Sequence, residues 1–329
     1  GLNDDDVGFM ASPMGHLTGF LWGLLHPMSI GMTMVFQDTW EPARLLDVVE
    51  EERIAWTVSA TPFVVDAIHE QQRAARSLSS FRLFVCGGAP IPPTLARKAH
   101  DVLGIQLIGL WGTSECGSVT LHRPDDSIEA VAASDGHVHP FMELNLVDEL
   151  GQSVERGHEG RLVARGPSVF VGYVGRRDLY DAVVDADGWF DTGDLGIQRE
   201  DGSIRISGRA KDIIVRGGEN VPVVEVENLL LQHPKIDRVV VIGVRDPRLG
   251  ERGCAVVVPK PGAAPTLKEL TAFLDAQGMA KQYWPELLEV RESLPTTPSG
   301  KVQKFMLREQ LNAAGRHASA AVRSTEVAQ

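Results

Sequence analysis

Residues 54–58 read Ile-Ala-Trp-Thr-Val, and residues 81–85 read Phe-Arg-Leu-Phe-Val. These short apolar runs, rich in β-branched and aromatic side chains, predict two buried strands. Residues 42–52 and 94–103 have helical patterns instead, so strands and helices alternate along the first third of the chain. Such alternation predicts an α/β sheet with parallel strands.

The pattern changes from about residue 136. Short strand patterns there are separated by Gly- and Asp-rich turns such as Asp201-Gly202, which favour tight connections between antiparallel strands. We therefore expect a small antiparallel β unit over residues 136–207. Its predicted strands are 142–147, 160–165 and 203–207.

The last third of the chain predicts a compact α+β domain. One helix begins at Pro222 and runs to about residue 232. A second helix follows the capping box of Thr266 and Glu269 and ends at Gly278. The predicted strands are 211–216, 238–244 and 254–259.

These patterns predict an α/β plus α+β protein with two domains, as 329 residues would suggest. The first domain, the C-terminal part of a large α/β domain, covers 1–208 and includes the antiparallel β unit. The second covers 209–315 and is small and mobile. Residues 316–329, rich in Ala and Ser, are expected to form a flexible tail.

Composition narrows the function. The net charge is -12, from 32 Lys and Arg against 44 Asp and Glu, which excludes a general affinity for nucleic acid or anionic membranes. Residues 7–37 carry no formal charge, but Pro13 and Pro27 interrupt them. We expect a buried helix and strand there and no transmembrane segment. Three widely spaced cysteines without a CxxC pair favour reduced thiols and a cytoplasmic protein; they are Cys86, Cys116 and Cys254.

Two segments near predicted strand ends carry residues suited to nucleotide chemistry. In Cys86-Gly-Gly-Ala-Pro90, two glycines allow a flat ligand to approach the backbone, although a plain tight turn is the favoured explanation of this segment taken alone. Trp111-Gly-Thr-Ser-Glu115 combines an aromatic ring, a hydroxyl and a carboxylate. These groups could stack a base, bind a phosphate oxygen and hold Mg²⁺.

Three charged residues stand in other distinctive segments. Asp194 ends Gly188-Trp-Phe-Asp-Thr-Gly-Asp194, where a carboxylate could accept both hydroxyls of a ribose. Arg209 lies where the pattern changes between the two predicted domains. Lys301 lies on a loop held by prolines and a glycine, and its point charge suits a developing negative charge. The ordinary alternatives are a hairpin turn at the Asp194 segment, a surface ion pair at Arg209 and a plain surface lysine at Lys301.

Together, in this order and spacing, the segments resemble the adenylate-forming superfamily of acyl-CoA synthetases, and the resemblance covers nearly the whole chain. Residues 216–225 and 280–285 are most similar to bacterial ligases for fatty or alicyclic acids, such as cyclohexanecarboxylate. The segments that carry the resemblance are Trp111–Glu115, Gly188–Asp194, Gly208-Arg-Ala-Lys-Asp-Ile-Ile-Val-Arg-Gly-Gly-Glu-Asn220 and Pro298-Ser-Gly-Lys-Val-Gln-Lys304.

The resemblance implies an ATP-dependent acid–thiol ligase. A carboxylic acid and ATP give an acyl-adenylate and pyrophosphate, and coenzyme A then accepts the acyl group. Lys301 would bridge the carboxylate and α-phosphate, Thr113 would contact the α-phosphate, and Glu115 would ligate Mg²⁺. Trp111 stands where the family usually has Tyr beside the adenine. The implied nucleotide-binding residues are Gly88, Ala89, Pro90, Trp111, Gly112, Asp194 and Arg209.

The family also implies domain movement between the two steps. Lys211 would be the hinge, and Gly217 and Gly218 would leave a slot for the pantetheine thiol. The expected substrate is an apolar acid without a charged head group, because the segments assigned to the acyl pocket contain no unpaired Lys or Arg. The implied acyl-pocket residues are His16, Leu110, Cys116 and Gly117.

The family carries a Ser/Thr/Gly-rich phosphate loop upstream of the His16 motif, and this chain does not contain it. We therefore expect a truncated ligase and leave open whether these residues are active alone. Two alternatives stay open: an adenylation domain that loads a carrier protein, and a non-catalytic AMP-binding fragment. The expected partners are the carboxylic acid and, if the chain self-associates, a second copy in a homodimer.

Overall fold

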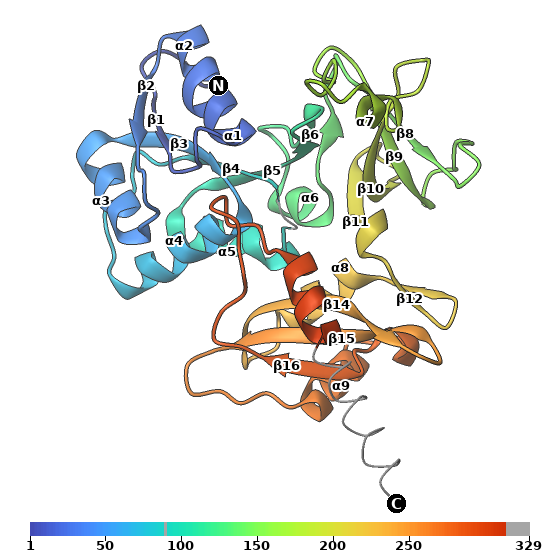
Figure 1. Ribbon diagram of the computed structural model, residues 1–329. Helices are drawn as coiled ribbons and strands as arrows, with labels where there is room; N and C mark the ends of the chain where they lie inside the picture. The colour runs from blue at the N-terminus through green and yellow to red at the C-terminus, as the bar shows by residue number, and fades with distance from the viewer. Residues whose placement is uncertain (89–90, 314–329) are drawn as a thin grey trace, which may run out of the picture. The chain divides into compact units, whose positions relative to one another are not determined.

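The computed structural model describes residues 1–88 and 91–313 (Figure 1). The predicted pocket residues Ala89 and Pro90 and the predicted tail lie outside the described residues. The chain divides into two compact units. The first contains Gly1–Ser207 and the short segment Pro298–Lys301; the second contains Gly208–Thr297 and the described residues from Val302 onward.

A seven-stranded sheet forms the centre of the first unit, in the order β2-β1-β3-β4-β5-β6-β7. The pairs from β2 through β5 are parallel, which confirms the predicted α/β sheet, whereas β6 and β7 pair antiparallel. The strands are β1 (Val7–Met10), β2 (Thr33–Phe36), β3 (Ile54–Ser59), β4 (Leu83–Cys86), β5 (Gln106–Thr113), β6 (Gly117–Leu121) and β7 (His137–Val138).

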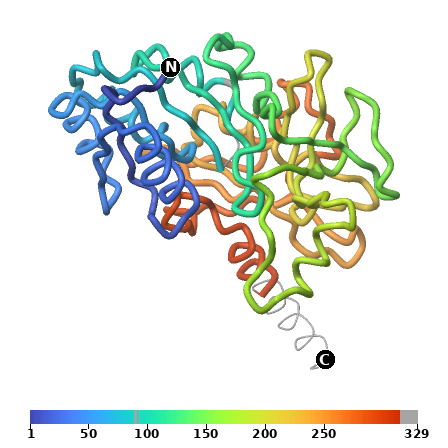
Figure 2. The backbone as a smooth tube through the Cα atoms, turned by 90° about the horizontal axis from the view of Figure 1, so that it is seen from above, coloured from blue at the N-terminus to red at the C-terminus, as the bar shows by residue number. Residues whose placement is uncertain are grey.

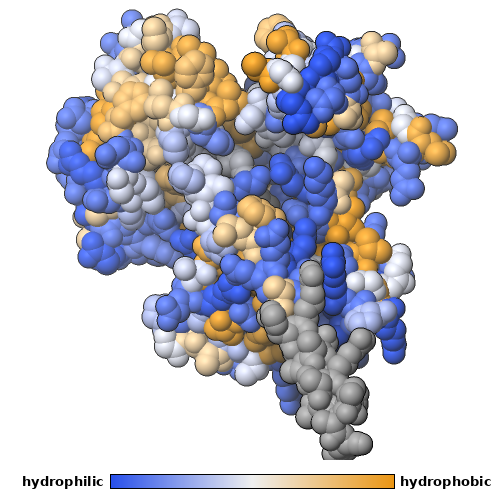
Figure 3. Space-filling model, viewed as in Figure 1, coloured by the Kyte–Doolittle hydropathy of each residue, from blue (hydrophilic) through white to orange (hydrophobic). Residues whose placement is uncertain are grey.

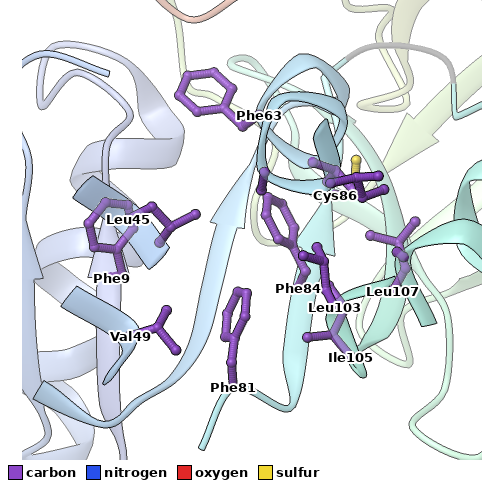
Figure 4. Close-up of a cluster of buried hydrophobic side chains, with 14 of the residues drawn as sticks. Phe9, Leu45, Val49, Phe63, Phe81, Phe84, Cys86, Leu103, Ile105 and Leu107 are labelled. Atoms are coloured by element: carbon purple, nitrogen blue, oxygen red, sulfur yellow. The ribbon is translucent and has the colours of Figure 1, made fainter. Parts of the chain in front are cut away.

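Three helices pack on one face of this sheet: α3 (Pro42–Glu52), α4 (Thr61–Arg73) and α5 (Pro93–Leu103). α3 begins at a proline, whose fixed φ suits the first helical turn, and has the bounds that the sequence predicts. Leu45 and Val49 on its buried face lie beside Phe9 of β1, and Phe84 of β4 lies near Leu103 of α5 in the same cluster (Figure 4). Burying a leucine or phenylalanine in this way contributes about 1.5–3 kcal/mol.

A shorter helical run lies between β1 and β2 in sequence. It packs against a second hydrophobic cluster of the first unit, which surrounds Trp56. It consists of α1 (Leu17–Phe20), the π-helical η1 (Leu21–Leu25) and α2 (His26–Ile30). A Cβ at Gly19 would lie 2.3 Å from the carbonyl oxygen of Pro13, so only glycine permits this close packing.

The expectation of a buried helix is wrong for the outer side of this run, which is exposed. Apolar residues gather over α1 and α2 in Figure 3. Within the described residues, no helix has both the length and the apolar character needed to span a bilayer. The exposed apolar side chains of the run and its flanks are Met14, Phe20, Leu24, Leu25 and Met28.

A four-stranded sheet follows in the first unit, in the order β11-β10-β9-β8, with its mapped pairs antiparallel as predicted. Each sheet of this unit is built from one continuous stretch of chain, blue to green and then green to yellow in Figure 2. The elements are α6 (Ile128–Ala133), β8 (Glu143–Val147), β9 (Glu159–Arg165), α7 (Arg177–Asp181), β10 (Phe190–Gln198) and β11 (Ile204–Arg209).

The second unit has a five-stranded sheet in which β13, β12, β15 and β14 are neighbours and β16 pairs with β15. Residues 304–313 are also helical. The elements are η2 (Ala210–Asp212), β12 (Ile214–Arg216), β13 (Glu219–Val221), α8 (Val223–Leu230), β14 (Ile236–Asp246), β15 (Gly250–Pro259), α9 (Leu267–Ala276), η3 (Lys281–Tyr283) and β16 (Leu287–Val290).

Two local predictions in this unit have different outcomes. The predicted strand at 211–216 is wrong at its start, because Ala210–Asp212 forms a 3-10 turn and the strand begins at Ile214. The capping box of Thr266 and Glu269 is confirmed, with both side-chain-to-backbone hydrogen bonds present. The three cysteines are free and buried: Cys86, Cys116 and Cys254.

The capping glutamate gives a pH prediction. Lys235 Nζ donates to Glu269 Oε1 at 2.6 Å, and these bonds lower the pKa of Glu269 from 4.5 to about 2. The carboxylate therefore stabilises the fold above pH 4.5, and this contribution is lost as pH falls towards 2. We expect Glu269→Gln to lower the urea midpoint at pH 7, with a deficit that shrinks between pH 4.5 and 2. An equal deficit at all three pH values would contradict the assignment.

Candidate active site

The hairpin of β5 and β6 holds the sequence Trp111–Glu115. A Cβ at Gly112 would lie 1.8 Å from the carbonyl oxygen of Gly117, so the two strands approach more closely than any side chain allows. Gly117 has a positive φ of 66°. The turn between them is closed by Thr113, whose Oγ1 accepts the Glu115 N–H at 3.2 Å. The predicted hydroxyl and carboxylate are thus brought together on one tight turn.

A second loop holds Glu115 in place. The Tyr173 hydroxyl donates to Glu115 Oε1 at 3.0 Å, and the Phe170 N–H donates to the Glu115 carbonyl at 2.7 Å. Burial and the bond to Glu115 raise the pKa of Tyr173, so its hydroxyl remains a donor at neutral pH. No sequence motif pointed to Tyr173, which is 58 residues from Glu115. The one feature that could have indicated Tyr173 is that it is an aromatic residue among exposed valines in a loop.

Trp111 and Asp194 contact each other directly. The Trp111 indole N–H donates to Asp194 Oδ2 at 2.8 Å, and the two side chains are only 8% and 4% exposed. The sequence indicated a ribose site at Asp194, and the family resemblance implied an adenine contact at Trp111, but neither predicted this bond. A buried carboxylate held by an indole N–H keeps a fixed orientation.

Asp194 lies in a bulge of β10. Asp191 pairs with Val163 and Leu195 with Arg161, so three residues of β10 lie opposite one residue of β9. Gly193 supplies the positive φ of 71° that this bulge needs. Within the motif at 188–194, Gly188 and Trp189 belong to a tight turn that closes the Val184–Phe190 bridge, and residues 192–194 form the bulge.

Removing the indole N–H should weaken the fold. We expect Trp111→Phe to lower the free energy of unfolding by about 1–3 kcal/mol, because a buried carboxylate oxygen loses a donor. Urea denaturation at pH 7 measures this. Trp284→Phe is a matched control. It also removes an indole N–H that donates a hydrogen bond, but its acceptor is the Met279 carbonyl in the second unit and not a carboxylate. A Trp111→Phe variant with the wild-type unfolding midpoint and AMP affinity would contradict the role given to this bond.

The residues assigned to the acyl pocket lie on several elements: Leu110 in β5, Cys116 in the turn after it, Gly117 at the start of β6 and His16 at the start of α1. Leu110 packs against Gly87, where an added Cβ would lie only 2.7 Å from Leu110 Cδ1. The next residue, Gly88, has a positive φ of 76°. Cys116 is fully buried, and burial raises the pKa of its thiol. His16 is exposed and caps α1, since its Nδ1 accepts the Thr18 N–H at 3.2 Å.

His16 keeps a neutral ring over a wider pH range than an ordinary histidine. Partial burial and the positive charge of Lys301, which belongs to the same compact unit, lower its pKa. Lys301 itself is exposed. It follows Gly300, whose φ is 81° and whose added Cβ would lie 3.1 Å from the Phe63 ring. The structure thus brings His16 and Lys301 within electrostatic reach of each other.

The remaining predicted residues belong to the second unit. Arg209 ends β11, and Lys211 lies in the 3-10 turn η2, where both are exposed. Gly217 and Gly218 form the two-residue turn between β12 and β13, with φ values of 60° and 92°. Two successive positive φ angles in a hairpin require glycine or a similar residue, which explains this pair.

The carboxylate at Glu115 fits a magnesium ion carried by a nucleotide. Among the described residues, no three His, Cys, Asp or Glu side chains gather as a metal site. Mg²⁺ bound with a nucleotide uses one or two carboxylates, and phosphates and water supply its other ligands. One carboxylate held by Tyr173 beside the Thr113 hydroxyl therefore matches the chemistry of such an ion.

Comparison with protein families agrees with these motifs. Residues 1–174 match the AMP-binding enzyme family, and residues 225–301 match the AMP-binding enzyme C-terminal domain. Because the first match alone covers more than half of the 329 residues, the chain belongs to the AMP-binding enzyme family.

Two curated relatives are acyl-CoA-forming enzymes. The chain is 41% identical to a medium-chain fatty-acid–CoA ligase of Escherichia coli (strain K12), over 93% of this chain and 54% of the relative. It is 35% identical to a feruloyl-CoA synthase of Amycolatopsis, over 94% of this chain and 62% of the relative. The chain thus spans between about half and two thirds of the length of these relatives.

Solved structures share the fold over nearly the whole chain. ATP-bound MatB from Rhodopseudomonas palustris matches with a TM-score of 0.88 and 29% identity, over 94% of this chain and 61% of that protein. The anthranilate CoA ligase AuaEII in complex with anthranoyl-AMP matches with a TM-score of 0.87 and 25% identity, over 96% and 61%. These neighbours bear out the predicted fold class.

Proposed function

We propose that the chain belongs to an ATP-dependent acid–thiol ligase. A carboxylate oxygen attacks the α-phosphorus of ATP, which gives an acyl-adenylate and releases pyrophosphate. A thiol, that of coenzyme A, then attacks the acyl carbon and releases AMP. The observation that carries the proposal is the pair of fixed carboxylates, with Asp194 bound by Trp111 and Glu115 bound by Tyr173.

These groups suit the first reaction. Asp194 would accept hydroxyl groups of the ribose, and the Thr113 hydroxyl would contact the α-phosphate. Glu115 would hold Mg²⁺, which neutralises phosphate charge and polarises the phosphorus when bound. Lys301, as a long-reaching cation, would stabilise the charge that builds on the carboxylate and α-phosphate.

The second unit would serve the thiol transfer. Its two-glycine turn, Gly217 and Gly218, leaves the backbone without side chains where a narrow pantetheine arm could lie against it. Arg209 and Lys211 lie at the start of this unit, so Lys211 would serve as the hinge for a change between the two half-reactions.

An apolar carboxylic acid is the proposed substrate. The assigned pocket residues Leu110 and Cys116 are apolar, and His16 stays neutral because its pKa is lowered. A pocket of this chemistry has no cation to pair with a second charged group on the acid. The named acids of the two curated relatives, a medium-chain fatty acid and ferulic acid, are also without a second charge.

Carboxylate-dependent ATP–pyrophosphate exchange on this chain tests the proposal, with a panel of fatty, alicyclic and aromatic acids and amino acids as the negative set. Exchange with apolar acids supports it, and preferred exchange with amino acids contradicts the substrate assignment. AMP binding without exchange by any acid would favour a non-catalytic nucleotide-binding fragment. Transfer to a phosphopantetheinyl protein but not to coenzyme A would favour a carrier-loading domain.

A further inference from the structure

A buried ion pair lies in the second unit, close in sequence to Lys301. Glu227 on α8 is 7% exposed, and its Oε1 forms a salt bridge with Lys304 Nζ at 2.8 Å. The same oxygen accepts the N–H of Val241 at 2.6 Å. One carboxylate oxygen therefore joins a helix, a strand and the segment that follows Lys301.

The Val241 N–H can bind Glu227 because β14 is an edge strand. β14 ends the order β13-β12-β15-β14, so among the described residues only β15 pairs with it. An edge strand presents unpaired backbone groups that need another partner. Glu227 supplies this partner from α8, and Lys304 balances its charge, so the carboxylate is buried without an unpaired charge.

Chain geometry links this pair to the Lys301 loop. The loop is closed by the bridge between Thr296 and Val302, and the Gln303 N–H donates to the Pro295 carbonyl at 2.8 Å. Lys304 is the next residue and begins the helix at 304–313, whose Leu307 is fully buried. The carboxyl-side stem of the loop is thus fixed three residues after Lys301.

We propose that Glu227 and Lys304 are positioning residues for Lys301. The pair fixes the end of the loop, so that Lys301 is presented from a stem of defined conformation and not from a flexible strand. This matters because a long lysine stabilises a developing charge only where its ammonium group is held in place. The inference rests on the proposed role of Lys301, but the state of the loop can be measured independently of any reaction.

Hydrogen exchange measures the loop on the chain as it is. We expect Lys304→Met to speed exchange of amides at 295–303 by about tenfold or more, because the stem opens locally. Lys304→Arg, which can still pair with Glu227, should restore protection. Lys235→Met is the matched control, since it removes a lysine from the exposed pair with Glu269 in the same unit and should leave the loop unchanged.

A double variant keeps the test informative if Lys304→Met does not fold. Glu227→Gln with Lys304→Met removes both charges, and the glutamine carbonyl can still accept the Val241 N–H. We expect this variant to fold and to show the same faster exchange at 295–303. Wild-type protection of the loop in either folded variant would overturn the proposal.

Kinetics then separate positioning from a purely structural tie. In the form of the protein that catalyses pyrophosphate exchange, Lys304→Met should lower kcat of adenylation about tenfold or more with little change in KM for ATP and acid. Thioester formation from supplied acyl-adenylate should be unaffected. A faster-exchanging loop with unchanged kcat would overturn the positioning role. Absence of pyrophosphate exchange in the wild type would instead count against the proposed function.

Discussion

Lys301→Ala is expected to slow carboxylate-dependent pyrophosphate exchange by about 10²–10³-fold, the usual effect of removing one group that stabilises transition-state charge. Negative charge builds on the carboxylate and the α-phosphate as adenylate forms, and alanine offers nothing to offset it. Thioester formation from supplied acyl-adenylate should survive, because this charge is no longer developing in the second step. Both half-reactions are measured on the same preparation.

The control for this substitution is Lys268→Ala. Lys268 is an exposed lysine on α9, and its loss should leave both half-reactions at the wild-type rate. Equal losses in adenylation and thioester formation by Lys301→Ala would mean that Lys301 serves binding or folding and not the first chemical step.

Gly112→Ala is expected to cost more than about 4 kcal/mol of folding free energy, which places it among the most damaging single substitutions. Its Cβ would lie 1.8 Å from the Gly117 carbonyl oxygen. The backbone fixes the position of the Cβ, and the oxygen is itself a backbone atom, so no side-chain rotation relieves the clash. The strands must separate, which also displaces Thr113 and Glu115 from the turn. Urea denaturation and AMP binding should both report the loss.

Gly15→Ala is the matched control for the hairpin substitution. Gly15 is also a glycine on the first unit, but a Cβ there meets nothing within 4 Å and its φ is not positive. We expect a change within about 0.5 kcal/mol, as for ordinary surface substitutions. A Gly112→Ala variant as stable as Gly15→Ala would show that the hairpin can open without cost.

Local signals explain the predictions that are confirmed. α3 begins at Pro42 and has apolar side chains at helical spacing, so its bounds follow from the nearest neighbours in sequence. The capping box of Thr266 and Glu269 likewise needs only four residues. The buried strands were recognised because a continuous apolar run suits a sheet covered on both faces.

Contacts between distant segments were beyond the sequence patterns. Trp111 and Asp194 are 83 residues apart, and no local pattern tells that the indole bonds the carboxylate. The same holds for Tyr173 and Glu115. In the π-helical turn η1, a Cβ at Gly23 would lie 2.9 Å from Met10 Cγ, a close tertiary contact that periodicity alone does not encode.

The bulge in β10 has a consequence for how the length of this segment can change. Between its two flanking pairs, β10 has two residues more than β9, an even number. Side chains alternate between the faces of a strand, so an even excess keeps the buried phase of Phe190, Asp194 and Gly196 unbroken. Deleting one residue at 192–194 would invert the phase of everything up to Gln198, whereas deleting Thr192 and Gly193 would keep both the phase and the inward carboxylate of Asp194. Within this bulge, only insertions or deletions of even length are therefore compatible with the pairing of β10 and β9.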